Sequence, residues 1–93
     1  MAVTIHLPGA LREFAGGQTI VEVLDPGGTL ADVLAALWRD YPAIRDRMAT
    51  EQGQVREHIN VFIGDENSRY TGGLMSPVAN GSEVTILPAV SGG

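Results

Sequence analysis

The 93-residue sequence contains no cysteine and no lysine. A chain without thiols has no disulfide framework, no thiolate zinc or iron–sulfur site and no cysteine nucleophile. All six basic residues are arginines, against 11 acidic residues, so the net charge is −5. This acidic balance argues against nucleic acid or an anionic membrane surface as a partner.

The sequence also lacks a long apolar run and a leader-like beginning. No segment approaches the roughly 20 apolar residues that span a bilayer. The first six residues carry neither a basic region nor a signal-peptide core. We therefore expect a cytoplasmic protein with no membrane partner.

The chain has the size of one domain, which we expect to cover residues 1–93. Such a domain buries one modest core and leaves little room for a deep catalytic cleft. Hydrophobic residues make up 44% of the sequence, which is normal for a soluble fold.

Apolar residues recur at spacings that predict one main helix and four strands. Thr29 is placed to cap the helix, Asp32 stands at the capping-box position, and Pro42 disfavours helical geometry beyond Tyr41. Shorter pieces are predicted to be helical at 43–48 and 74–79, and extended at 68–70. The main helix is predicted at 30–41 and the strands, from period-two alternation and turn signals, at 3–7, 19–24, 57–63 and 83–87. This order favours an α+β fold in which one helix packs on one face of a mixed sheet of four or five strands.

Arrangements typical of catalytic or metal sites are missing from the sequence. His6 and His58 fall in separate predicted strands, where a lone histidine is more often structural or exposed than catalytic. Asp65 and Glu66 are interpreted as a solvated turn, because no metal-ligand set surrounds them. The paired glycines lack the Gly-Lys-Ser/Thr continuation of a phosphate loop. We therefore predict no catalytic residue, no metal ligand and no cofactor bound by the chain.

The C-terminus is the most distinctive part of the sequence. The last predicted strand is followed by Pro88, which breaks a strand ladder, and the chain ends with Gly92 and Gly93. Two glycines have no side chains to obstruct a narrow channel and adopt backbone angles closed to other residues. Residues 88–93 are therefore predicted to be a flexible reactive tail that presents the terminal carboxylate to another protein. The alternative is an ordinary frayed end.

The run Val84-Thr85-Ile86-Leu87-Pro88-Ala89-Val90-Ser91-Gly92-Gly93, together with the turn Asn80-Gly81 before it, resembles the C-terminus of the ubiquitin-like sulfur carriers of the ThiS/MoaD type. That family has the β-grasp fold and includes the small subunit of molybdopterin synthase and the thiamine-pathway carrier. Leu11-Arg12-Glu13 also looks like the molybdopterin-synthase subunit. The paired Gly72-Gly73, the longer middle region and the ending 85–90 are most similar to the CysO-type carriers of cysteine biosynthesis, with Ser91 in place of an expected alanine.

The resemblance implies that the chemistry takes place on the carboxylate of Gly93. A partner enzyme uses ATP to adenylate this carboxylate, and a sulfur donor then converts it to a thiocarboxylate. Gly92, Ser91 and Val90 thread into the partner. In the CysO-type pathway the sulfur goes to a PLP-dependent cysteine synthase and a metalloprotease releases the product, whereas in the molybdopterin pathway the acceptor is the synthase large subunit.

Other classes of function stay open on the sequence alone. The chain is alternatively a ubiquitin-like modifier joined through Gly93 to lysines of target proteins. A further alternative is an interaction domain whose glycine tail has no function of its own. An enzyme would need an internal acid–base pair, and the sequence offers none, so we do not expect an enzyme.

The partner is expected to dock on the sheet face opposite the helix. Alternation places Val84 and Ile86 inward, and Thr85 and Leu87 on the open face. In the first strand it likewise places Thr4 and His6 on the open face. The third strand is ambiguous, and by resemblance to ubiquitin-like sheets, and because Phe62 has more apolar area to bury, we place it inward and Val61 outward. The predicted docking patch is Val61, Leu87 and Pro8, with Arg12 at its edge.

Overall fold

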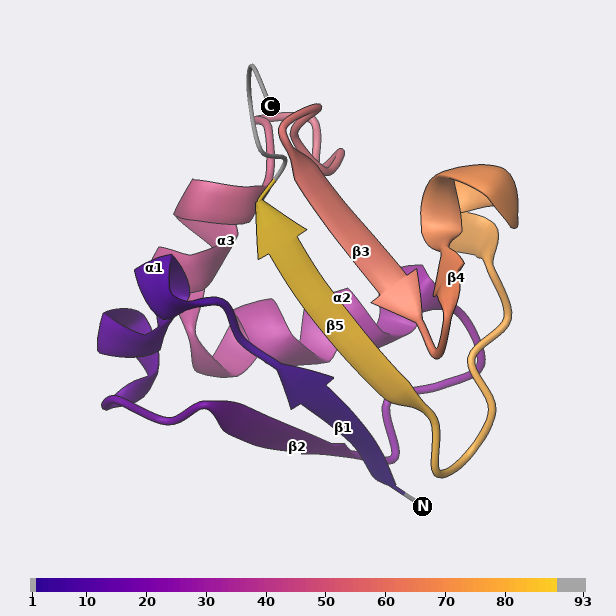
Figure 1. Ribbon diagram of the computed structural model, residues 1–93, viewed down its shortest axis with the longest axis horizontal. Coiled ribbons are helices and arrows are strands. Elements are labelled where there is room, and N and C mark those ends of the chain that lie inside the picture. The colour runs from indigo at the N-terminus through magenta and orange to yellow at the C-terminus, as the bar shows by residue number, and fades with distance from the viewer. Residues whose placement is uncertain (1, 89–93) are drawn as a thin grey trace.

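The structure, a computed structural model, describes residues 2–88 and contains a mixed five-stranded sheet (Figure 1). The strand order is β2-β1-β5-β3-β4; β5 is parallel to β1, and the other neighbours are antiparallel. This confirms the predicted α+β class with its mixed sheet. The strands are β1 (Ala2–His6), β2 (Ile20–Leu24), β3 (Ile59–Ile63), β4 (Glu66–Asn67) and β5 (Glu83–Pro88).

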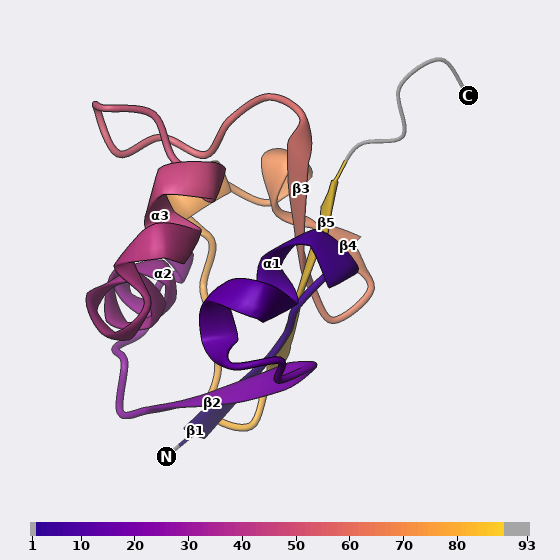
Figure 2. The same ribbon diagram turned by 90° about the vertical axis from the view of Figure 1, so that its left-hand side faces the viewer.

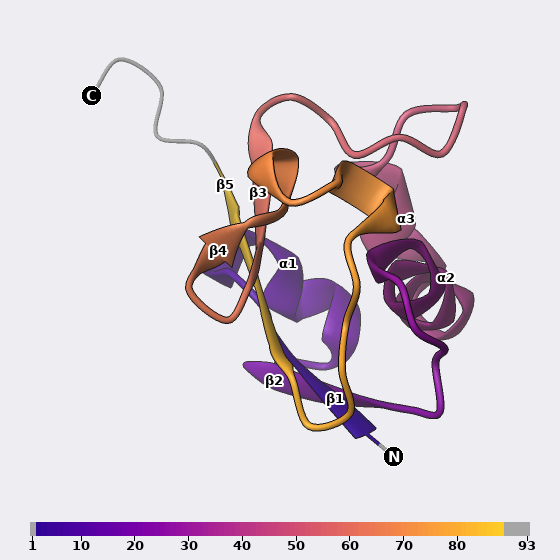
Figure 3. The same cartoon turned by 90° about the vertical axis from the view of Figure 1, so that its right-hand side faces the viewer.

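The main helix and a second, shorter helix cover one face of the sheet, and no helix of the described residues covers the other face (Figures 2 and 3). They are α2 (Leu30–Asp40) and α3 (Pro42–Met48), while the single-turn α1 (Gly9–Arg12) follows β1 near the end of the sheet. Short 3₁₀ turns complete the connections between these elements. They are η1 (Glu13–Ala15), η2 (Ser68–Tyr70) and η3 (Gly73–Met75).

The core forms between the helices and the inward residues of the three central strands. Val3 and Ile5 of β1 and Val84 and Ile86 of β5 are fully buried, as their alternation predicts. Their neighbours Thr4, His6, Thr85 and Leu87 are half-buried or exposed on the open face. The buried stripe of α2 meets them at helical spacing and consists of Leu30, Val33, Leu34 and Leu37.

The start of α2 has the predicted capping box. Thr29 Oγ1 accepts a hydrogen bond from the Asp32 amide at 3.2 Å. Asp32 Oδ2 in turn accepts from the amides of Thr29 and Gly28, both at 3.2 Å. These bonds satisfy amides that the first helical turn leaves without partners. Pro42 stands at the first position of α3 and separates it from α2.

The helical piece predicted at 74–79 is found only as η3, and residues 76–79 are not helical. Two other local predictions are wrong, each for an identifiable reason. Pro88 does not break the ladder but is the last residue of β5, paired with Ile59. Because β1 pairs with β5 only as far as Thr85, β5 is an edge on that side at Pro88, where proline is tolerated. Residues 68–70 form a 3₁₀ turn rather than an extended piece, because Asn67 Oδ1 accepts the Arg69 amide at 3.0 Å and caps the turn.

Between residues 2 and 88 no helix has the combined length and hydropathy of a transmembrane segment.

The capping box provides a test that uses two adjacent glycines. Gly27 has φ +117°, and a Cβ there would lie 2.6 Å from Asp32 Oδ2, whereas a Cβ at Gly28 meets nothing within 4 Å. We expect Gly27→Ala to lower the free energy of unfolding by about 1–3 kcal/mol, through strain and loss of the cap. Gly28→Ala should change it by less than about 0.5 kcal/mol. Urea denaturation of both variants measures the difference, and equal effects would contradict this account of the helix start.

Candidate functional site

The open sheet face carries a row of side chains that runs across four strands. The register pairs Ile20 with His6, His6 with Thr85, and Thr85 with Phe62. Ile20 is 47% exposed, and Phe62 is half-buried. Leu87 lies two residues beyond Thr85 on the same face and is 44% exposed. The part of the face nearest the end of β5 therefore exposes the apolar side chains of Phe62 and Leu87, next to the polar Thr85.

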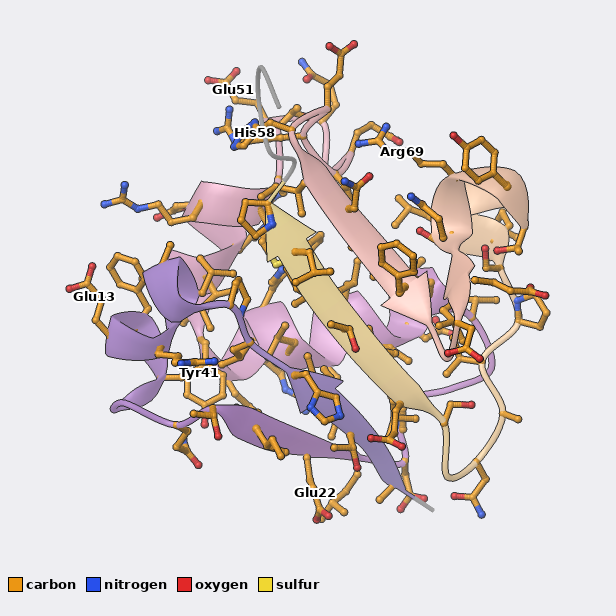
Figure 4. The ribbon with its side chains drawn as sticks, in the orientation of Figure 1. Glu13, Glu22, Tyr41, Glu51, His58 and Arg69 are labelled. Atoms are coloured by element: carbon orange, nitrogen blue, oxygen red, sulfur yellow. The ribbon has the colours of Figure 1, made fainter. Side chains whose placement is uncertain are left out.

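The opposite part of the same face is acidic. One register step away from the apolar row, Thr4 pairs with Glu22 on one side and Glu83 on the other. Glu83 Oε1 accepts a hydrogen bond from His6 Nε2 at 2.7 Å. Figure 4 shows Glu22 at the far end of the sheet from His58, which lies beside the end of β5. On the open face, Glu22 and Glu83 therefore lie farther from the C-terminal end of β5 than Phe62 and Leu87 do.

Phe62 belongs to this face, and the prediction that placed Phe62 inward and Val61 outward is wrong. Val61 is 2% exposed and faces the core with Ile86, its partner on β5. Strand alternation gives Asn60 the same side as Phe62. An inward Phe62 would bury the Asn60 amide in the apolar core, which costs more than the extra apolar area gains. On the open face Asn60 Oδ1 instead accepts hydrogen bonds from Arg69 Nε and Asn67 Nδ2.

The remaining residues of the predicted patch lie near the same end of the sheet. Leu87 is exposed, as expected, and Pro8 is half-buried between β1 and α1. Arg12 is exposed, and its Nε donates to the Leu7 carbonyl at 3.2 Å, which fixes the guanidinium over the end of β1. Leu87, Pro8 and Arg12 thus lie near one end of the sheet, Val61 does not face outward, and docking through such a patch stays a prediction.

The predicted reactive tail lies mostly outside the described residues. Val90, Ser91, Gly92 and Gly93 are not among residues 2–88. The structure does describe where the tail begins, because β5 ends at Pro88 beside Leu87. Gly93 follows this point by five residues.

Arg69 holds the loop before β3 in place, a role that the sequence did not indicate. Its Nη2 donates to the carbonyls of Glu57 and Ile59, at 2.5 and 2.8 Å. Its Nε donates to Asn60 Oδ1 at 3.2 Å. Figure 4 shows Arg69 to the right of the upper end of β3, with His58 and Glu51 to the left. The guanidinium therefore orders the segment that carries His58 to the end of the sheet where β5 stops.

The described residues offer no group of three or more histidine, aspartate or glutamate side chains that could hold a metal ion. His6 and His58 lie at different places on the molecule, His6 on the open face and His58 beside the end of β5.

The model of the ThiS family matches residues 5–93, so the chain belongs to this family of ubiquitin-like sulfur carriers. Its relatives are small carrier and modifier proteins, and the chain is not itself an enzyme.

Individual relatives place the chain more closely within that family. The chain is 39% identical to the sulfur carrier protein CysO of Mycobacterium tuberculosis over the full length of both. It is 35% identical to small archaeal modifier protein 1 of Haloferax volcanii, over 89% of this chain and 91% of that protein. A chain in the crystal structure of the Amycolatopsis orientalis BexX/CysO complex superposes with a TM-score of 0.87 at 36% identity, covering 98% of this chain and 99% of that one.

The assignment of faces is testable with two substitutions to threonine. Val61→Thr places a hydroxyl in the apolar core, so we expect it to lower the free energy of unfolding by about 1–3 kcal/mol. Leu87→Thr changes a side chain that is already 44% exposed and should cost less than about 1 kcal/mol. Thermal denaturation followed by circular dichroism measures both. A larger loss from Leu87→Thr than from Val61→Thr would reverse the assignment.

Proposed function

We propose that this protein is a cytoplasmic sulfur carrier whose terminal carboxylate, on Gly93, is converted to a thiocarboxylate. The observation that carries the proposal is the position of the Gly-Gly end, five residues beyond Pro88, where the exposed apolar part of the open face also lies. A docked partner can hold that face and receive the tail at the same time. The full-length similarity to a sulfur carrier protein supports the same role.

A carboxylate needs activation before it accepts sulfur, because its leaving group would be oxide. In the proposed first step, a Gly93 carboxylate oxygen attacks the α-phosphorus of ATP on a partner enzyme, and pyrophosphate leaves. Sulfide from a donor then attacks the acyl carbon of the adenylate; a C–S bond forms, the C–O bond to AMP breaks, AMP and a proton leave, and a thiocarboxylate remains. ATP is thus a substrate of the partner, and the carrier holds no cofactor of its own.

The tail has the properties that such a reaction needs. Five residues in extended conformation span about 17 Å, enough to reach into an active site from a docked domain. Gly92 and Gly93 present no side chain to the channel walls, and Ser91 and Val90 are small enough to follow them. The chain contains no cysteine, so the sulfur resides on the main-chain terminus.

Within this role we favour sulfur delivery for cysteine biosynthesis. The similarity to CysO, at 39% identity over the whole chain, supports an acceptor of that kind, a PLP-dependent cysteine synthase with a metalloprotease that releases the product. The small subunit of molybdopterin synthase is the alternative within sulfur carriage.

Protein modification is the second candidate function, and a specific relative favours it. Small archaeal modifier protein 1 is 35% identical over most of both chains. In this role the activated Gly93 carboxyl would be transferred to a lysine amine of a target protein. This chain has no lysine of its own, so it could not form chains through its own side-chain amines.

Intact-mass spectrometry separates these functions. The purified protein is incubated with ATP, a sulfide donor and candidate adenylating enzymes. We expect a mass increase equal to the exchange of one oxygen for sulfur, and no such increase when Gly93 is deleted. A wild-type mass that stays unchanged with every enzyme would overturn the proposal, and covalent attachment to other proteins without sulfur incorporation would favour modification.

The docking face is testable with two exposed leucines on the same sheet face. Leu87 lies next to the start of the tail, whereas Leu24 is 70% exposed at the far end of β2. We expect Leu87→Asp to raise the KM for the carrier in the adenylation assay about tenfold, equivalent to about 1.4 kcal/mol of binding energy. Leu24→Asp, with the same change of charge, should stay within about twofold of wild type. Equal effects of the two variants would count against docking through this end of the face.

A further inference from the structure

A hollow of about 480 Å³ lies at the start of the tail, beside the open sheet face. Its walls come from three parts of the chain that meet at the end of the sheet: α1 with η1, α3, and the ends of β3 and β5. Pro88 itself lines the hollow. The apolar lining includes Pro8, Leu11, Phe14, Ile59 and Pro88.

The rim of the hollow carries two basic side chains, Arg47 and His58. The Arg47 guanidinium lies 5.0 Å from the centre of the Phe14 ring, so it is stacked at the edge of the apolar lining. Neither side chain forms a hydrogen bond or an ion pair with another residue in the range 2–88. Among residues 2–88, Glu13 is the one carboxylate that also lines the hollow. Two hydrogen-bond donors that can pair with an acidic group, Arg47 and His58, therefore lie at the hollow, although the chain as a whole has a net charge of −5.

The length of the tail brings this hollow into the interface with any enzyme that acts on Gly93. Only five residues separate Pro88 from the reacting carboxylate, so that carboxylate lies within about 17 Å of Pro88. The mouth of the partner's channel must come closer still, because part of the tail lies inside the channel. The surfaces that surround Pro88, including the hollow, then face the channel mouth.

We propose that this hollow receives a projecting apolar side chain at the channel mouth of the adenylating enzyme, next to a carboxylate that pairs with Arg47 and His58. The inference rests on the proposed function, and it adds a second contact, on the helix side of the tail, to the contact through Leu87. With contacts on both sides of Pro88, at Leu87 and in the hollow, the partner enzyme fixes the direction in which the tail enters its channel. The apolar lining provides burial, and the two basic groups select an acidic partner surface.

Charge reversal at the rim tests the proposal, with an arginine elsewhere as the matched control. The probe is the adenylating enzyme that produces the sulfur mass shift with the wild-type chain. Arg47→Glu should raise the KM for the carrier at least about tenfold and leave kcat within about twofold, because the reacting carboxylate is untouched. Arg39→Glu makes the same change of charge at an arginine that lies 3.6 Å from Asp40, away from the hollow, and should stay within about twofold of wild type.

A steric variant tests the apolar part of the contact. Ala10 is exposed and lines the hollow, so Ala10→Tyr fills the space without disturbing the core. We expect a similar rise in KM with unchanged thermal stability. Wild-type KM values for both Arg47→Glu and Ala10→Tyr would overturn this inference while leaving the proposed function intact.

Two other occupants of the hollow give different results. If the chain's own tail rested there, Arg47→Glu would release it and speed adenylation. If a second copy filled it, a dimer detected by sedimentation would dissociate in Ala10→Tyr with no change in KM. Either result overturns the proposal, and a wild-type chain that no enzyme adenylates overturns both it and the proposed function.

Discussion

The pairing of β5 between β1 and β3 is the interaction on which the rest of the structure depends. It places Val84 and Ile86 at the centre of the sheet, fully buried beneath α2. The same pairing sets the register that puts Thr85 and Leu87 on the open face. β5 is the central strand of the sheet and the last strand of the described residues. The described part of the chain therefore ends on a strand that pairs with β1 on one side and with β3 on the other.

In this arrangement, the residues that stabilise the domain are different from the group that is proposed to react. The buried residues of the sheet and helices hold the domain together, while the proposed reacting group is a main-chain carboxylate that needs no side chain. The folded part therefore has to supply only a docking surface and a fixed point from which the tail departs. The absence of cysteine and lysine fits this division, since neither a thiol nor an amine side chain competes with the terminus.

The two sides of Pro88 offer different kinds of surface. On the sheet side, Leu87 is exposed and Phe62 is half-buried. On the helix side, Arg47 stacks on Phe14 at the rim of the hollow. The carboxylates of Glu22 and Glu83 lie farther from Pro88 than Leu87 and Phe62 do.

The sequence by itself determined the main helix and the four longer strands, and the reactive end at Gly93 stays a prediction. Alternation in β1 and β5, the Thr29 and Asp32 cap and the stripe of α2 are local patterns, and each is found where it was expected. The orientation of β3 was also encoded, since the polarity of Asn60 requires Phe62 to share its side, but this follows only once the pairing with β5 is known. The hollow at Pro88 follows only from the tertiary structure. Residues about 80 positions apart in the chain line it, and no local sequence pattern predicts that they lie together.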